Sequence, residues 1–296
     1  MSKYRYCGGS QAGKSHERSS IVCQDAFCIL DKEDFIIAAV ADGLGSSKHS
    51  DIAADMAANS AAGYCADHIC NEMNDEQILS VIKNAFDNTN YEIKQKANDC
   101  PDDYDTTLTL AVFIEGIIYF GHAGDSGIIA LRTDGVFEKV TEQQLGDGEG
   151  VDLPVYPLAA KSRWVFGKYK QRAGVIFLMT DGILNKVIPY LLKSQEYKMD
   201  HAYLYYLYDN MRKNQNLDDW IKDELSLIIP NEVRYDDKTL VAILCSSVKI
   251  KHRPKAYYEF PSESLYRSLL DEQKNALNAI SSSINDKEIN KESERI

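Results

Sequence analysis

Apolar positions recur along the chain with two different spacings, which predict strands and helices in turn. Short β-like runs come first, near Tyr4, from Asp25 and from Phe35, and the run from Phe35 is apolar on both faces, as in a buried strand. Two helices are predicted next. The first covers about 50–71 and is rich in alanine, and the second covers about 75–98, with apolar residues at helical spacing.

The middle of the chain is rich in β-like runs separated by glycine-containing turns. TTLTLAVFIEG, IIYFGHAGDSG and IIALRTDG predict an antiparallel meander, and VFEKVT is expected to add a short strand. Between Glu142 and Ala173 the polarity is mixed and has little period. We expect a loop or lid there, with some short strand pairing.

The last third of the chain repeats the pattern of a strand that ends at an aspartate. GVIFLMTDGI predicts such a strand, helices are expected near 201–214 and 217–227, and DDKTLVAILCSS predicts a last strong strand. This order favours an α+β sandwich of mostly antiparallel sheets flanked by helices over a doubly wound parallel sheet. We expect one domain over 1–248 and a C-terminal extension over 249–296, partly helical (SLYRSLLDEQKNALNAI) with a polar tail.

Composition and charge limit the kinds of molecule that the protein is expected to bind. Thirty-three basic and forty-five acidic side chains give a net charge of −12, which disfavours nonspecific binding to nucleic acid or to an anionic membrane. The seven cysteines form no CxxC pair, so neither a zinc ribbon nor a disulfide framework is indicated. With no hydrophobic signal core and no apolar run near the roughly 20 residues that span a bilayer, we expect a cytoplasmic protein.

Five aspartates stand at the edges of apolar β-like runs: Asp25, Asp42, Asp125, Asp181 and Asp237. One aspartate in a turn is ordinary, but five strand-edge aspartates could converge at one end of the sheets. Clustered carboxylates raise one another's pKa unless cations neutralise them, so the pattern predicts a metal site. Oxygen ligands suit Mg²⁺ and Mn²⁺, and the missing His and Cys ligand spacing argues against structural zinc.

The segments around these aspartates resemble the metal-dependent protein phosphatases of the PP2C family. The resemblance runs from about Gly9 to Ser247, through CQDAF, VADGLGSS, DTTLTLAVF, GHAGDSGIIALR, LMTDGILN and DDKTLVAIL, in that order. It implies an α-β-β-α sandwich. It also implies a Mg²⁺- or Mn²⁺-dependent enzyme that removes phosphate from phosphoserine and phosphothreonine of proteins with a metal-activated water.

The resemblance also implies which residues bind the metals. Asp42 would bridge two ions, and the Gly43 carbonyl would be a further ligand. Asp181 and Asp237 would complete the protein ligands of the first ion, and Asp25 would support the site largely through water. These residues make up most of the expected metal centre.

Further residues are implied at the edge of this centre. Asp125, with Asp181, would hold a third and weaker metal, and Thr107 would lie in the core beside the site. The family commonly places a phosphate-contacting arginine just before its first aspartate motif, which makes Arg18 or His16 a candidate for contacting the phosphate. A solvated polar loop is the competing interpretation of that segment.

The chain departs from the family pattern in three places. Gln24 stands where many members carry glutamate, Lys238 follows Asp237 where asparagine is common, and LGSS replaces a DGHGG-type turn. A second hypothesis therefore stays open, namely a weakly active or inactive regulatory module that binds a phosphoprotein or a kinase. The expected partners are a phosphorylated protein substrate and a cognate Ser/Thr kinase. A haloacid-dehalogenase enzyme is disfavoured because VADGLG lacks the DxD nucleophile motif.

Overall fold

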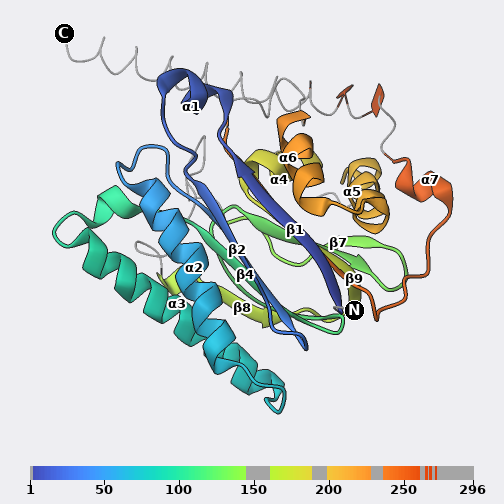
Figure 1. The fold of residues 1–296 in the computed structure, drawn as a ribbon, viewed down its shortest axis with the longest axis horizontal. Helices are drawn as coiled ribbons and strands as arrows, with labels where there is room; N and C mark the ends of the chain where they lie inside the picture. Colours follow the sequence, from blue (N-terminus) through green and yellow to red (C-terminus); the bar gives the residue numbers. More distant parts are fainter. Residues whose placement is uncertain are drawn as a thin grey trace, which may run out of the picture.

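Two antiparallel five-stranded sheets pack face to face, with helices on both outer faces, in the computed structural model of the chain (Figure 1). The structure describes residues 3–144, 161–188, 199–227 and 236–260, together with residues 264, 265, 267, 268 and 271. The first sheet has the strand order β1 (Tyr4–Gln11), β10 (Lys238–Cys245), β9 (Ala173–Met179), β6 (Gly127–Arg132) and β7 (Phe137–Lys139). The second has the order β2 (Asp25–Asp31), β3 (Ile36–Asp42), β4 (Leu108–Ile114), β5 (Ile117–Ala123) and β8 (Val165–Lys168).

The helices divide between the two outer faces. The second sheet is covered by α2 (Ser50–His68) and α3 (Asp75–Ala97), whereas α4 (Asp181–Val187), α5 (His201–Lys213), α6 (Leu217–Leu227) and the short α7 (Lys255–Tyr258) pack on the first sheet. One short helix, α1 (Lys14–Ser19), connects β1 to β2, and two 3₁₀ turns cover Pro101–Tyr104 and Lys161–Arg163. The predicted sandwich is confirmed.

Alternation of apolar residues explains the three layers of core. In β10, Val241 and Ile243 face the other sheet, whereas Leu240 and Ala242 face the helices. Helix α2 packs closely on β2 and β3 because its buried face is almost entirely alanine: Ala53, Ala54, Ala57, Ala58, Ala61 and Ala62 are all fully buried. The ends of the strands are therefore held in fixed relative positions.

The predicted helices and strands are found with small shifts of their ends, but the predicted meander is wrong in its third strand. β4 and β5 pair as expected, whereas β6 crosses to the first sheet and pairs with β9 and β7. The chain turns at Gly124, whose φ of 118° favours glycine, and this turn carries Asp125 across the gap between the sheets. Helix α1 was not predicted, because its six residues are too few to show a period.

Two predicted segments lie partly outside the described residues. Of the expected loop or lid, 145–160 is outside them, while β8 provides the expected short pairing with β5. The predicted C-terminal helix from Ser264 lies mostly outside them as well. None of the helices in the described part of the chain is long and apolar enough to cross a membrane.

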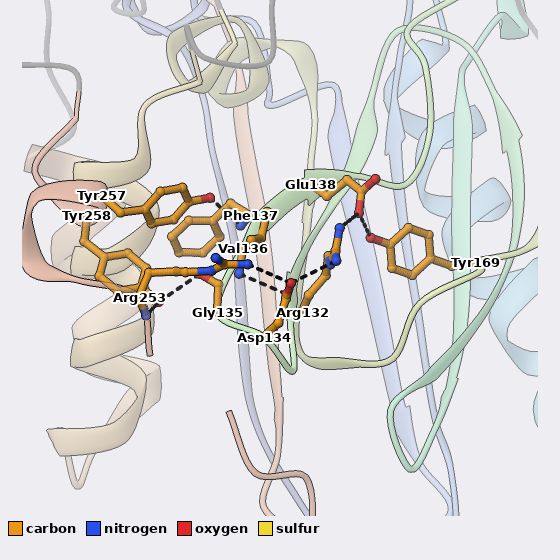
Figure 2. Close-up of polar contacts among 10 residues, drawn as sticks. All are labelled: Arg132, Asp134, Gly135, Val136, Phe137, Glu138, Tyr169, Arg253, Tyr257 and Tyr258. Atoms are coloured by element: carbon orange, nitrogen blue, oxygen red, sulfur yellow. Dashed lines mark hydrogen bonds and ion pairs between the residues drawn. The ribbon is translucent and has the colours of Figure 1, made fainter. Parts of the chain in front are cut away.

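Residues 249–260 pack against the turn between β6 and β7 (Figure 2). The hydroxyl of Tyr258 donates to the Gly135 carbonyl (2.8 Å) and accepts from the Arg253 amide (3.1 Å). The Arg253 guanidinium and that of Arg132 both bind Asp134, each at 2.9 Å. The domain boundary at 248 stays a prediction, but Tyr258 of the extension is buried and stacks on Tyr205 of α5.

We expect Tyr258→Phe to lower the free energy of unfolding by about 1–3 kcal/mol, because it leaves a buried carbonyl and amide without their partner. Urea unfolding followed by circular dichroism measures the change. Tyr91→Phe is the matched control, since Tyr91 on α3 is 61% exposed and its loss of a hydroxyl should have almost no effect. Equal stability of the two variants would contradict the packing of the extension.

Candidate functional site

The predicted aspartates meet at one end of the sandwich. Asp25 begins β2 and Asp42 ends β3, and the two are direct partners in the antiparallel register. Asp125 lies in the turn that crosses between the sheets, and Asp181 begins α4 directly after β9. Asp237 precedes β10, whose first residues pair with the end of β1. All five strand ends therefore point to the same region.

Hydroxyl groups join the two sheets at this end. The Thr180 hydroxyl donates to Asp25 Oδ2 (2.7 Å) and accepts the Thr239 amide (2.9 Å), which ties β2 to β9 and β10. Thr107 is buried beside the site, as predicted, and its hydroxyl accepts the Asp42 amide at 2.9 Å. These contacts hold the carboxylate-bearing backbone in place.

Two aspartate–glycine pairs allow close backbone approach. A Cβ at Gly43 would lie 2.6 Å from the Ser50 carbonyl oxygen and 2.8 Å from that of Gln24. A Cβ at Gly182 would lie only 2.0 Å from the Asp237 carbonyl oxygen. Each glycine is therefore required so that a third segment can pack against the residue that follows the aspartate.

Burial and mutual repulsion raise the pKa values of these carboxyl groups. The pKa of Asp42 is raised well above its ordinary value by burial and then by the charges of Asp25, Asp181, Asp125 and Asp236. That of Asp25 is raised by burial and by Asp237 and Asp181, against a hydrogen bond from Thr180 that lowers it. Burial and Asp125 raise the pKa of Asp181 to about 7, and Asp42 is close enough to share a hydrogen bond with it. A cation would relieve this repulsion.

The donor set fits a hard divalent cation. Asp25 Oδ1 and Gln24 Oε1 are buried, and neither has a hydrogen-bond partner within the described residues. No three His, Cys, Asp or Glu side chains in the described ranges are arranged so that they could hold one metal ion together. Mg²⁺ commonly keeps several waters and uses only one or two carboxylates, so its binding does not require such a group.

Asp237 uses its carboxylate for hydrogen bonds to three other groups. Oδ1 accepts from the Gly13 amide (2.7 Å) and contacts His16 Nδ1 (2.9 Å), and Oδ2 accepts from the Gln24 amide (2.6 Å). The residue is only 3% exposed. Both of its oxygens therefore already accept hydrogen bonds, and its role as a metal ligand stays a prediction.

The charge of the neighbouring Asp236 also interacts with other carboxylates of the site. The residue as a whole is exposed, yet close packing around its carboxyl group and the charge of Asp181 raise its pKa to about 7. From the sequence, Asp236 is expected to be a turn residue that could also support its neighbour Asp237. The signal was the DD pair itself; both of its charges interact with that of Asp181, whereas Asp237 also binds Gly13, His16 and Gln24.

The two candidate phosphate-contacting residues differ in position. His16 is partly buried against Asp237, whereas Arg18 lies exposed on α1. On the other side of the site, Gln143 donates to the Asp125 carbonyl (2.8 Å) and to Asn185 (3.2 Å), both contacts that the sequence did not predict. Lys238, noted only as a departure from the pattern, is a buried residue of β10.

Comparison with known proteins identifies the class. The family model for protein phosphatase 2C matches residues 12–226, more than half of the chain. The chain therefore belongs to the protein phosphatase 2C family. No curated protein sequence matches it.

Solved structures support the same fold. The serine/threonine phosphatase Stp1 from Staphylococcus aureus is 14% identical, with a TM-score of 0.57 over 81% of this chain and 94% of that one. The S. agalactiae serine/threonine phosphatase is 16% identical, with a TM-score of 0.56 over 81% and 99%. PppA from Pseudomonas aeruginosa, a key regulatory component of T6SS, is 16% identical, with a TM-score of 0.55 over 81% and 97%. At these identities the likeness concerns the fold alone.

Without metal, the site should destabilise the folded protein as the pH rises. Folded Asp181 keeps its proton up to about pH 7, whereas an unfolded aspartate loses it near 3.8. Between these values the folded state binds more protons, so the free energy of unfolding falls with rising pH. Asp181→Asn lacks this charge, and we expect it to gain roughly 1–3 kcal/mol over wild type between pH 4 and 7 in EDTA.

Urea unfolding at several pH values measures this difference. Exposed Asp87→Asn on α3 is the control, since its replacement should not reproduce the pH dependence. A difference between Asp181→Asn and wild type that is the same at pH 4 and pH 7 would contradict the raised pKa.

Proposed function

We propose that the protein is a Mg²⁺- or Mn²⁺-dependent phosphatase that hydrolyses phosphoserine and phosphothreonine in proteins. The observation that carries this proposal is the set of mutually repelling carboxylates at the joined ends of the two sheets, in a chain of the protein phosphatase 2C family. A phosphorylated protein substrate, a cognate Ser/Thr kinase and a cytoplasmic location belong to the same proposal.

Asp42 and Asp181 are the residues best placed to hold two cations, with the Gly43 carbonyl as a further ligand. Asp25 and Gln24 would act through water, and Asp125 with Asp181 would hold a third, weaker ion. When bound, the cations would offset the phosphate charge and lower the pKa of a water so that it can attack phosphorus. Mg²⁺ and Mn²⁺ accept the same oxygen ligands.

The protein's own side chains would handle the substrate and the proton. Nδ1 of His16 contacts Asp237, so Nε2 is the ring nitrogen that remains to exchange a proton with the leaving oxygen. The exposed Arg18 carries a permanent positive charge on the same short helix, suited to a phosphate oxygen. Asp237 orients the imidazole.

We further propose that Asp236, in preference to Asp237, would support the first metal through water. The three hydrogen bonds of Asp237 support this assignment, because they already hold that carboxylate to Gly13, His16 and Gln24, whereas within the described residues Asp236 accepts no such contacts from this segment. The charge of Asp236 acts on Asp42, which supports its place beside the expected bridging ligand.

The first test is hydrolysis of a phosphothreonine peptide with Mn²⁺, with Mg²⁺ and with EDTA. We expect metal-dependent turnover that Asp42→Asn lowers at least about 100-fold, because the bridging carboxylate loses its charge. Thermal unfolding shows whether the variant is folded. Absence of turnover from folded wild type with either metal would overturn the phosphatase proposal and favour the inactive regulatory module, which the departures at Gln24 and the LGSS turn also favour.

Paired variants separate the roles of Asp236 and Asp237. We expect Asp236→Asn to raise the Mn²⁺ concentration for half-maximal activity about tenfold or more with little change in stability, since it removes only a carboxylate that supports the metal. Asp237→Asn should instead lower the unfolding midpoint, because its amide cannot accept all three donors. Manganese titrations and urea unfolding provide the two measurements. The reverse pattern would restore Asp237 as the ligand.

A further inference from the structure

The segment between β1 and β2 is held at both ends by one carboxylate. Asp237 accepts the amide of Gly13, which precedes α1, and the amide of Gln24, which precedes β2, and it also binds His16 within the segment. The ends of residues 14–23 are therefore fixed beside each other. Figure 1 shows α1 where the segment connects the ends of β1 and β2, beyond the sheets.

The C-terminal end of α1 is also fixed. Ser20 adopts a left-handed conformation with a φ of 55°. Its amide donates to the Glu17 carbonyl (3.3 Å), and the Ile21 amide donates to that of His16 (2.9 Å). Such paired bonds close a helix in a defined geometry and usually bring an apolar residue after the turn against the helix.

Here, however, the apolar residues after the turn are exposed to solvent. Ile21 is 44% exposed and Val22 is 61% exposed, although both are β-branched residues with little conformational freedom to lose on binding. Arg18, four residues before Val22, is exposed on the same segment. A rigid segment thus presents a cation and two adjacent aliphatic side chains.

The segment is close to the proposed catalytic site. Val22 is three residues from Asp25, so their Cα atoms are at most about 11 Å apart. A peptide of three residues covers the same length. An apolar side chain of a substrate could therefore contact Ile21 and Val22 while the phosphorylated residue lies near the carboxylates.

We propose that Ile21 and Val22 form a docking surface for an apolar residue within about three positions of the phosphorylated residue in a phosphopeptide. The proposal rests on the proposed phosphatase function. Charge complementarity supports an anionic occupant, because Lys14 and Arg18 outweigh the single acidic Glu17 on this segment, within a chain whose net charge is −12. The surface selects the substrate, whereas the carboxylates carry the reaction.

The test compares two labelled peptides that carry a non-hydrolysable phosphonate analogue of phosphoserine. One has valine at the second and third positions on both sides of the analogue, and the other has serine there. Fluorescence anisotropy with Mn²⁺ measures both dissociation constants for wild type, Ile21→Ser/Val22→Ser and the control Tyr91→Ser. We expect wild type and the control to bind the valine peptide about tenfold more tightly. The double variant should bind both peptides equally.

Equal binding of the two peptides by wild type, or a preference kept by the double variant, would overturn the docking surface. Hydrolysis of p-nitrophenyl phosphate tests the phosphatase proposal separately, because this small ester has no neighbouring residues to dock. We expect the double variant to hydrolyse it at the wild-type rate. A preference for the valine peptide without any hydrolysis would support the surface and reject the enzyme.

Discussion

Repulsion between buried carboxylates is the constraint on which the rest of this structure depends. Asp25, Asp42 and Asp181 come from two sheets; Asp25 and Asp181 raise the pKa of Asp42, and Asp181 also raises that of Asp25. Such an arrangement opposes folding at neutral pH unless protons or cations neutralise it. The core must therefore hold the strand ends together against this repulsion. A bound metal ion would supply the positive charge that reduces it.

The packing that resists this repulsion is built from close backbone approaches. Alanines bring α2 onto β2 and β3, and the glycines after Asp42 and Asp181 let neighbouring segments pack against the backbone. The Thr180 hydroxyl then joins Asp25 to the strands of the other sheet. Because these contacts are made by backbone and short side chains, they fix the strand ends with little conformational freedom.

The aspartate pair before β10 contributes to the site in two ways. Asp237 binds the segment between β1 and β2, and the charges of both Asp236 and Asp237 interact with that of Asp181. The pair Asp236–Asp237 thus adds negative charge to the site and also holds the segment between β1 and β2 in place. The segment that Asp237 holds carries His16, Arg18 and the exposed Ile21 and Val22. Asp237 would therefore position the residues proposed for catalysis as well as those proposed for substrate selection.

The sequence by itself determined the layers of this protein and the approximate position of its site. Apolar period and alternation identified the buried strands and the helices, because burial of one face imposes that period whatever the partner. The aspartates at strand ends could be found for the same reason, since a charged residue ends an apolar run. Only the tertiary structure decided that β6 crosses to the other sheet and that Asp237 holds Gly13, His16 and Gln24 by hydrogen bonds. Strand pairing and side-chain partners depend on contacts between residues far apart in the chain, which leave no local period in the sequence.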